Sequence, residues 1–159
     1  MDSPIHCPMR DKALLLIIGP TPPPYHGVAV AMQTLLQSSL VDRFRVSHLD
    51  LADRRGIQHV NKPDLHDVVL FCQQWIKLIS ILVRKRPAAT YLVLSQSTIG
   101  FIRDSLLLWP AFISGSRLVL HLHGGNFREW FLDRSWLMRT YVRTVLGRAS
   151  RVVVVGVAF

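Results

Sequence analysis

The sequence predicts an α/β fold, a Rossmann-like three-layer domain around a mostly parallel sheet of about five strands. Short apolar runs alternate along the chain with longer segments in which apolar residues recur at helical spacing, a pattern typical of βαβ units. The first run, residues 13–18, has no polar side chain and ends at Gly19-Pro20, as expected of a strand buried on both faces of a sheet. A length of 159 residues suits one domain.

Each element is predicted from its own run of residues. Strands are expected over residues 13–18, 44–49, 89–94, 117–122 and 151–155. Helices are expected over residues 28–40, 64–85, 99–113 and 135–146, with Pro110 bending or breaking the third of them. One face of the second helix carries Leu65, Val68, Val69, Cys72, Ile76, Ile79 and Val83. We expect that helix to be buried, with Cys72 in the core. Residues 1–11 read as a polar leader and residues 12–159 as the domain.

The order of the strands decides which loops meet. Right-handed crossovers leave few arrangements for five parallel strands, and we expect the Rossmann-type order 3-2-1-4-5. Ligands of such sheets bind where the order reverses, at the carboxyl ends of the strands. In this order the loops after the first and fourth strands face each other, and these are the two most unusual loops of the chain.

The charge balance is strongly basic. Nineteen Lys and Arg oppose ten Asp and Glu, a formal charge of +9. We expect no nucleic-acid partner, because no binding motif is present and the cations are dispersed. The run Arg84-Lys85-Arg86 and the arginines of residues 134–148 suit either a solvated face or an anionic lipid surface.

The expected location of the protein in the cell rests on two kinds of segment that we do not find in the sequence. Neither a membrane-spanning run nor a signal peptide is recognisable. We therefore expect a cytoplasmic protein, with a peripheral position at the inner face of the membrane as an open alternative.

The loop after the first strand joins a proline run to His26 and Gly27, where the next helix begins. Glycine lets a ligand approach the backbone closely, and a helix N-terminus favours phosphate. The loop has neither the GxGxxG pattern of dinucleotide-binding domains nor a P-loop. From this loop alone, a Pro-rich turn capped by glycine is the favoured explanation.

The loop after the fourth strand is the stronger candidate. His121 and His123 are two residues apart, so their side chains point the same way if the strand continues. We expect His121 to be a hydrogen-bonded core histidine. His123 is the predicted functional residue, because it lies at the strand's carboxyl end beside Gly124 and Gly125. Asn126 offers a further polar contact or a helix cap.

Two further interpretations concern these loops. An H-x-H pair can ligate zinc, but a catalytic site usually needs three protein ligands. His26 is the only obvious third candidate, so we expect no metal and no cofactor. Ser95 and Gln96 follow the third strand, and either contact a substrate or belong to a polar loop that caps the next helix.

In combination, three segments resemble the family 4 glycosyltransferases. Residues 14–30 (LLLIIGPTPPPYHGVAV) are similar to the first strand and loop of that family. Residues 119–127 (VLHLHGGNF) resemble its fourth strand and histidine loop, and residues 148–156 (RASRVVVVG) its closing N-terminal strand. The resemblance implies a GT-B enzyme, which transfers a sugar from a nucleotide-sugar donor with retention. It implies that Gly27 lies near the donor phosphates and that His123 contacts the transferred sugar.

The same resemblance implies that something is missing. In that family the nucleotide and a Glu-x7-Glu element belong to a C-terminal domain, whereas Glu129 is the only glutamate here. We therefore expect the acceptor-side N-terminal domain of a retaining glycosyltransferase, a fragment unable to transfer sugar alone. The expected acceptor is a sugar or lipid-linked sugar of cell-surface polysaccharide or glycolipid synthesis. A non-catalytic Rossmann-like binding domain is the alternative, and a metal-dependent hydrolase the third reading.

Overall fold

The fold is an α/β sandwich built on one parallel sheet. The computed structural model describes residues 12–54 and 65–154, so the predicted leader, residues 1–11, lies outside the described residues. The five strands are β1 (Leu14–Gly19), β2 (Arg45–Asp50), β3 (Ala89–Leu94), β4 (Arg117–Leu122) and β5 (Arg151–Val154). Every pairing between neighbouring strands is parallel, which confirms the predicted fold class.

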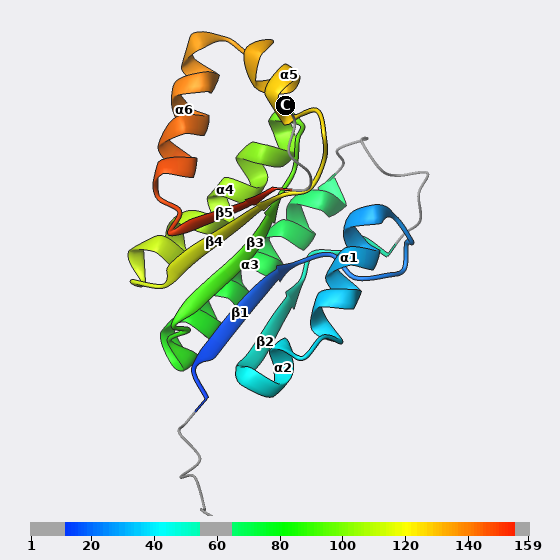
Figure 1. The fold of residues 1–159 in the computed structure, drawn as a ribbon, viewed down its shortest axis with the longest axis vertical. Coiled ribbons are helices and arrows are strands. Elements are labelled where there is room, and N and C mark those ends of the chain that lie inside the picture. The colour runs from blue at the N-terminus through cyan, green and yellow to red at the C-terminus, as the bar shows by residue number, and fades with distance from the viewer. Residues whose placement is uncertain (1–11, 55–64, 155–159) are drawn as a thin grey trace, which may run out of the picture.

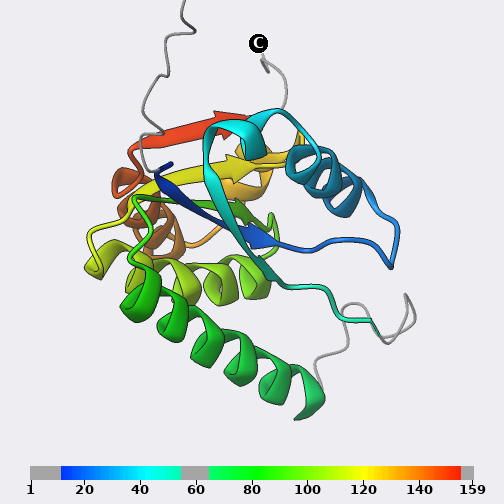
Figure 2. The same ribbon diagram turned by 90° about the horizontal axis from the view of Figure 1, so that it is seen from below.

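Helices cover both faces of the sheet (Figures 1 and 2). They are α1 (Gly27–Leu36), α2 (Leu40–Arg43), α3 (Leu65–Lys85), α4 (Thr98–Ile113), α5 (Phe127–Leu132) and α6 (Trp136–Gly147). On one face Met32 of α1 packs against Leu15 and Ile17. The other face carries the larger core, to which α3, α4 and α6 contribute buried side chains. The fully buried β1 runs between the two cores, as its apolar sequence predicts.

The predicted strand order is wrong. The observed order is β2-β1-β3-β4-β5, whereas we expected 3-2-1-4-5. Both orders join parallel strands by right-handed crossovers, and the pattern of a strand does not tell on which side of β1 it is added. The sheet changes its direction of growth between β1 and β3, so the loops after those two strands flank the switch point.

Pro110 does not break α4, which continues to Ile113. A proline inside a helix lacks the N–H that would bond to the carbonyl four residues earlier, here Leu106. The indole Nε1 of Trp75, on α3, donates to that same Leu106 carbonyl at 3.3 Å. The neighbouring helix thus supplies the donor that Pro110 lacks, and α3 is tied to α4 at this point.

The prediction that the apolar face of α3 starting at Leu65 is buried is also wrong. Leu65, Val68, Val69, Ile76 and Val83 are exposed, and so is Cys72. The helix instead buries Gln74, Leu78 and Leu82 against the sheet. By length and composition alone α3 passes as a membrane-crossing helix, and 17% of its apolar window is buried. One such helix is weak evidence for a membrane span. The periodicity located an apolar face correctly but could not tell which face meets the sheet.

Replacing Trp75 tests the tie between α3 and α4. Trp75→Phe removes the donor and leaves the Leu106 carbonyl without it, so the free energy of unfolding should fall by about 1 kcal/mol. In a Pro110→Ala background the new amide N–H can reach Leu106 along the helix, and the same Trp75→Phe change should then cost less. Denaturant unfolding of the four proteins measures this coupling. Equal costs in both backgrounds would contradict the shared carbonyl.

Candidate functional site

Three loops meet at the carboxyl edge of the sheet, those after β1, β3 and β4. The first and last of these loops approach each other at Gly27 and His123. A Cβ placed on Gly27, the first residue of α1, would lie 3.7 Å from Nε2 of His123. The loops after β1 and β4 therefore lie close together, as expected, although β3 lies between those two strands in the sheet.

The loop after β3 supports the histidine loop. The side-chain amide of Gln96 donates from Nε2 to the carbonyl of Gly124 at 2.9 Å. Gly124 has φ +154, a conformation that other residues rarely adopt, and a Cβ there would meet Gln96 at 2.6 Å. Gln96 and Gly124 are thus brought together, and this contact fixes the backbone that follows His123.

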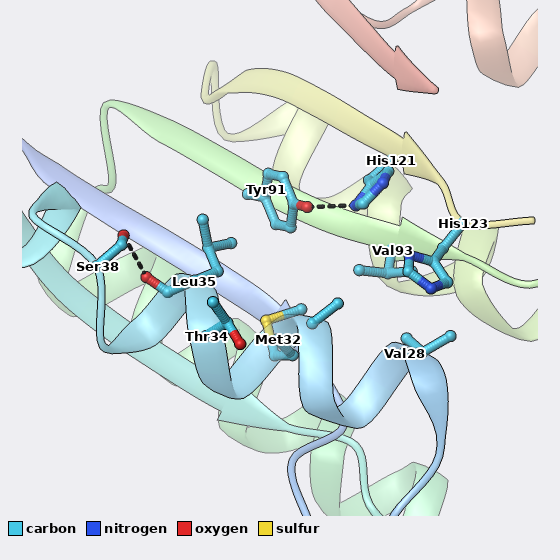
Figure 3. A pocket seen from close by; sticks show the side chains of 10 residues that line it. Val28, Met32, Thr34, Leu35, Ser38, Tyr91, Val93, His121 and His123 are labelled. Carbon is cyan, nitrogen blue, oxygen red and sulfur yellow. Dashed lines mark hydrogen bonds between the residues drawn. The ribbon is translucent and has the colours of Figure 1, made fainter. Parts of the chain in front are cut away.

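A pocket of about 280 Å³ opens beside His123, between α1 and the strands β3 and β4 (Figure 3). Its α1 side and the following turn provide Val28, Ala31, Met32, Thr34, Leu35 and Ser38, and its strand side Tyr91, Val93, His121 and His123. Figure 3 shows the phenol of Tyr91 directed at His121, with His123 on the side of Val28. The pocket is therefore apolar along α1 and carries two imidazoles on the opposite wall.

The two imidazoles interact with each other and with Tyr91. Their ring centroids are 5.3 Å apart, and the Tyr91 hydroxyl lies 2.5 Å from Nδ1 of His121. Burial, and then the charge of His123, lowers the pKa of His121, so this imidazole is neutral near pH 7. Burial raises the pKa of Tyr91 to about 12, and its hydroxyl keeps its proton.

One buried nitrogen of each imidazole has no hydrogen-bond partner in the part of the chain that the structure describes. Nε2 of His121 and Nδ1 of His123 are buried and form no hydrogen bond with the described residues. Buried polar atoms without a partner are costly and uncommon. His121 is hydrogen-bonded, as expected of it, but its imidazole lines a pocket where a core position was predicted. The imidazoles of His121 and His123 nevertheless both line the pocket.

The remaining predicted residues have local structural contacts. His26 caps α1, because its Nδ1 accepts from the amide of Ala29 at 3.4 Å. Asn126 takes the N-cap position of α5 without a side-chain cap bond, and Gly125 faces open space. The amide of Ser95 donates to a carboxylate oxygen of Asp104 at 2.8 Å. None of these four lines the pocket.

Sequence reasoning missed Asp50, which ends β2. Its carboxylate accepts from the amide of Thr21 at 3.0 Å and from the Thr21 hydroxyl at 2.9 Å. It also accepts from Ala52 and Arg54. Burial alone would raise the pKa of Asp50, but these hydrogen bonds outweigh it and leave the pKa below its usual value. Asp50 thereby anchors the proline loop that leads to Gly27, and its position at a strand's carboxyl end was the one available signal.

A metal centre finds no support in the side-chain geometry. Within residues 12–54 and 65–154, no three His, Cys, Asp or Glu side chains gather closely enough to hold an ion. His26, the proposed third ligand, already uses Nδ1 as a helix cap.

Comparison with known proteins does not assign the chain to a family. No protein-family model matches the chain, and no curated protein matches it.

Loss of the Asp50 carboxylate should loosen the first loop. Asp50→Ala leaves the Thr21 donors without their acceptor, so the free energy of unfolding at pH 7 should fall by about 1–3 kcal/mol. Because the folded pKa lies below 3.8, this contribution is complete above that pH and disappears as the pH falls through the folded value. Denaturant unfolding across the acid range measures it. Asp133→Ala, which removes an exposed carboxylate, is the control, and an equal loss there would refute the anchor.

Proposed function

We propose that this chain is the acceptor-side N-terminal domain of a retaining glycosyltransferase that uses a nucleotide-sugar donor. The observation that carries the proposal is the approach of His123 to Gly27 at the start of α1. It joins a helix N-terminus, which favours phosphate, to an imidazole that can bind a hydroxyl group. The resemblance of residues 14–30 and 119–127 to family 4 glycosyltransferases supports the same assignment.

Sugar transfer makes two demands that these groups can meet. Negative charge grows on the leaving phosphate, and the helix N-terminus at Gly27 can stabilise it, since the first turn of α1 carries no acidic residue. The sugar must also be held in a fixed orientation toward the acceptor. His123 is suited to this role, because Gln96 fixes its loop through Gly124.

The pocket beside His123 suits a sugar ring of the acceptor. Its volume of about 280 Å³ is close to the lower end of small-molecule sites, about 300 Å³. The apolar side chains of α1 can cover the C–H face of a sugar. The imidazoles of His121 and His123, which line the same pocket, are the groups proposed to bind its hydroxyl groups.

The family resemblance adds the partners of this reaction. A donor-binding domain with the glutamate pair would complete the enzyme, and no metal or other cofactor would be needed. A lipid-linked acceptor of cell-surface polysaccharide or glycolipid synthesis would place the reaction at the inner face of the membrane. The alternative, a binding domain without catalysis, would use the same pocket and differ only in the absence of transfer.

Replacing His123 tests the proposed reaction. In a polypeptide that joins this domain to a donor-binding domain, His123→Ala should lower the turnover of sugar transfer by about 10²-fold, the usual cost of one preorganised donor. His66→Ala, which removes an exposed imidazole from α3, should leave turnover unchanged. Near-normal turnover of His123→Ala would remove this residue from the reaction. Saturable sugar binding without any transfer would favour the binding domain.

Gly27→Ala separates the site from the stability of the fold. The added methyl has room at 3.7 Å from His123, and alanine favours a helix more than glycine, so the fold should gain up to about 1 kcal/mol. The methyl nevertheless occupies the space in which a phosphate would approach α1, and nucleotide-sugar affinity should fall about tenfold, or 1.4 kcal/mol. Calorimetric titration of the polypeptide joined to a donor-binding domain measures the affinity, and thermal unfolding of the domain alone measures the stability. Gly147→Ala, at the end of α6 in open space, should leave affinity unchanged, and an equal loss there would contradict the site.

A further inference from the structure

The outer side of α3 carries an apolar stripe that no other part of the described chain covers. Its members follow one another at helical spacing and are exposed: Leu65, Val68, Val69, Cys72, Trp75, Ile76 and Val83. The opposite side of the same helix is fixed in the core through Leu78 and Leu82. The stripe is therefore a surface of the folded domain and does not arise from an undocked helix.

A second apolar stripe lies on the neighbouring helix. α4 packs beside α3 (Figure 2) and exposes Ile99, Ile102, Leu106 and Ile113. The two helices are joined by the hydrogen bond from Trp75 to the Leu106 carbonyl. Trp75 is itself exposed by 40%, so it bridges the stripes. We call the exposed side chains of both stripes the α3–α4 face.

The charges around the α3–α4 face are mostly positive. Among the described residues of the two helices and the turn after α3, the cations are Lys77, Arg84, Lys85, Arg86 and Arg103. The Nζ of Lys85 donates to Ser47 on β2 at 3.3 Å, so the border consists of the other four. The acidic residues of the same helices are Asp67 and Asp104, and Asp104 is buried and bonded to Arg103. The face thus joins a broad apolar surface to a cationic border, in a chain with a net charge of +9.

We propose that the α3–α4 face docks the domain onto an anionic phospholipid bilayer, with both helices lying along the surface. Contiguous exposed apolar patches are rare on soluble monomers and mark interaction sites. A helix with an apolar face and a basic border binds in the plane of the lipid headgroups, and each cation near the surface adds to the attraction. Because α3 buries Gln74, Leu78 and Leu82 against the sheet, it lies on the membrane and does not cross it. This inference does not depend on sugar transfer.

Vesicle flotation tests the docking directly, with no sugar present. The full chain is mixed with vesicles of phosphatidylcholine alone, or of phosphatidylcholine with phosphatidylglycerol, at low and high salt. Binding is expected to the anionic vesicles, reduced by salt. Val69→Glu and Ile76→Glu should each weaken it by about tenfold or more, since a charge then enters the apolar layer. The matched control is Val30→Glu on α1, on the other face of the sheet, because Val30 and Val69 are exposed by 44% and 47%.

The cationic border is tested separately. Lys77→Gln and Arg84→Gln should each lower binding to anionic vesicles about fivefold and weaken the salt dependence. Arg43→Gln on α2 is the control and should have no effect. Circular dichroism checks that every variant is folded, and two glutamate variants at different positions keep the test valid if one of them is not.

Three results would overturn the proposal. Equal binding by Val69→Glu, Ile76→Glu and wild type would place the contact elsewhere on the chain. Absence of binding to anionic vesicles would remove the membrane. A wild-type dimer in light scattering that Val69→Glu converts to a monomer, without vesicle binding, would assign the α3–α4 face to a second copy of this chain.

Discussion

The parallel pairing of β1, β3 and β4 is the constraint on which the candidate site depends. Strands that run in one direction deliver their following loops to one edge of the sheet. Gly27 and His123 are far apart in the sequence, yet this pairing leaves them in contact distance. In the strand order, the loop after β3 lies between the loops after β1 and β4. From that loop, Gln96 donates a hydrogen bond to the carbonyl of Gly124.

Burial then sets the chemistry of the groups gathered there. Loss of water lowers the pKa of His121 and raises that of Tyr91, so both are neutral at physiological pH. Neutral groups can exchange hydrogen bonds with hydroxyl groups without the cost of moving a charge out of water. In the proposed function, the leaving phosphate would be stabilised instead by the N-terminus of α1, whose dipole does not titrate. The proposed function therefore assigns polar recognition and charge stabilisation to different parts of one site.

The sequence was sufficient for the five strands and the four longer helices, because apolar periodicity is a local property, and for the meeting of two loops, because parallel strands end at one edge. It missed α2 and α5, which are too short to show a helical period. It was insufficient for the strand order, since either side of β1 accepts β3 by a right-handed crossover. It also misjudged α3, which is apolar both on the side that meets the sheet and on the side of Ile76. The contribution of Tyr91 could not be read from the sequence, because an aromatic residue in a strand is ordinarily core.

The most direct measurement of the central claim is the mapping of a bound nucleotide-sugar by NMR on the isotope-labelled chain. The labelled chain is joined to an unlabelled donor-binding domain for this measurement, because the account assigns the nucleotide to that domain. If the loops after β1, β3 and β4 form one site, saturable shifts should appear together at the amides of Gly27, Gln96 and Gly124 and vanish in the His123→Ala variant. Shifts confined to surfaces away from this edge of the sheet, or shifts that persist without the imidazole, would contradict the account.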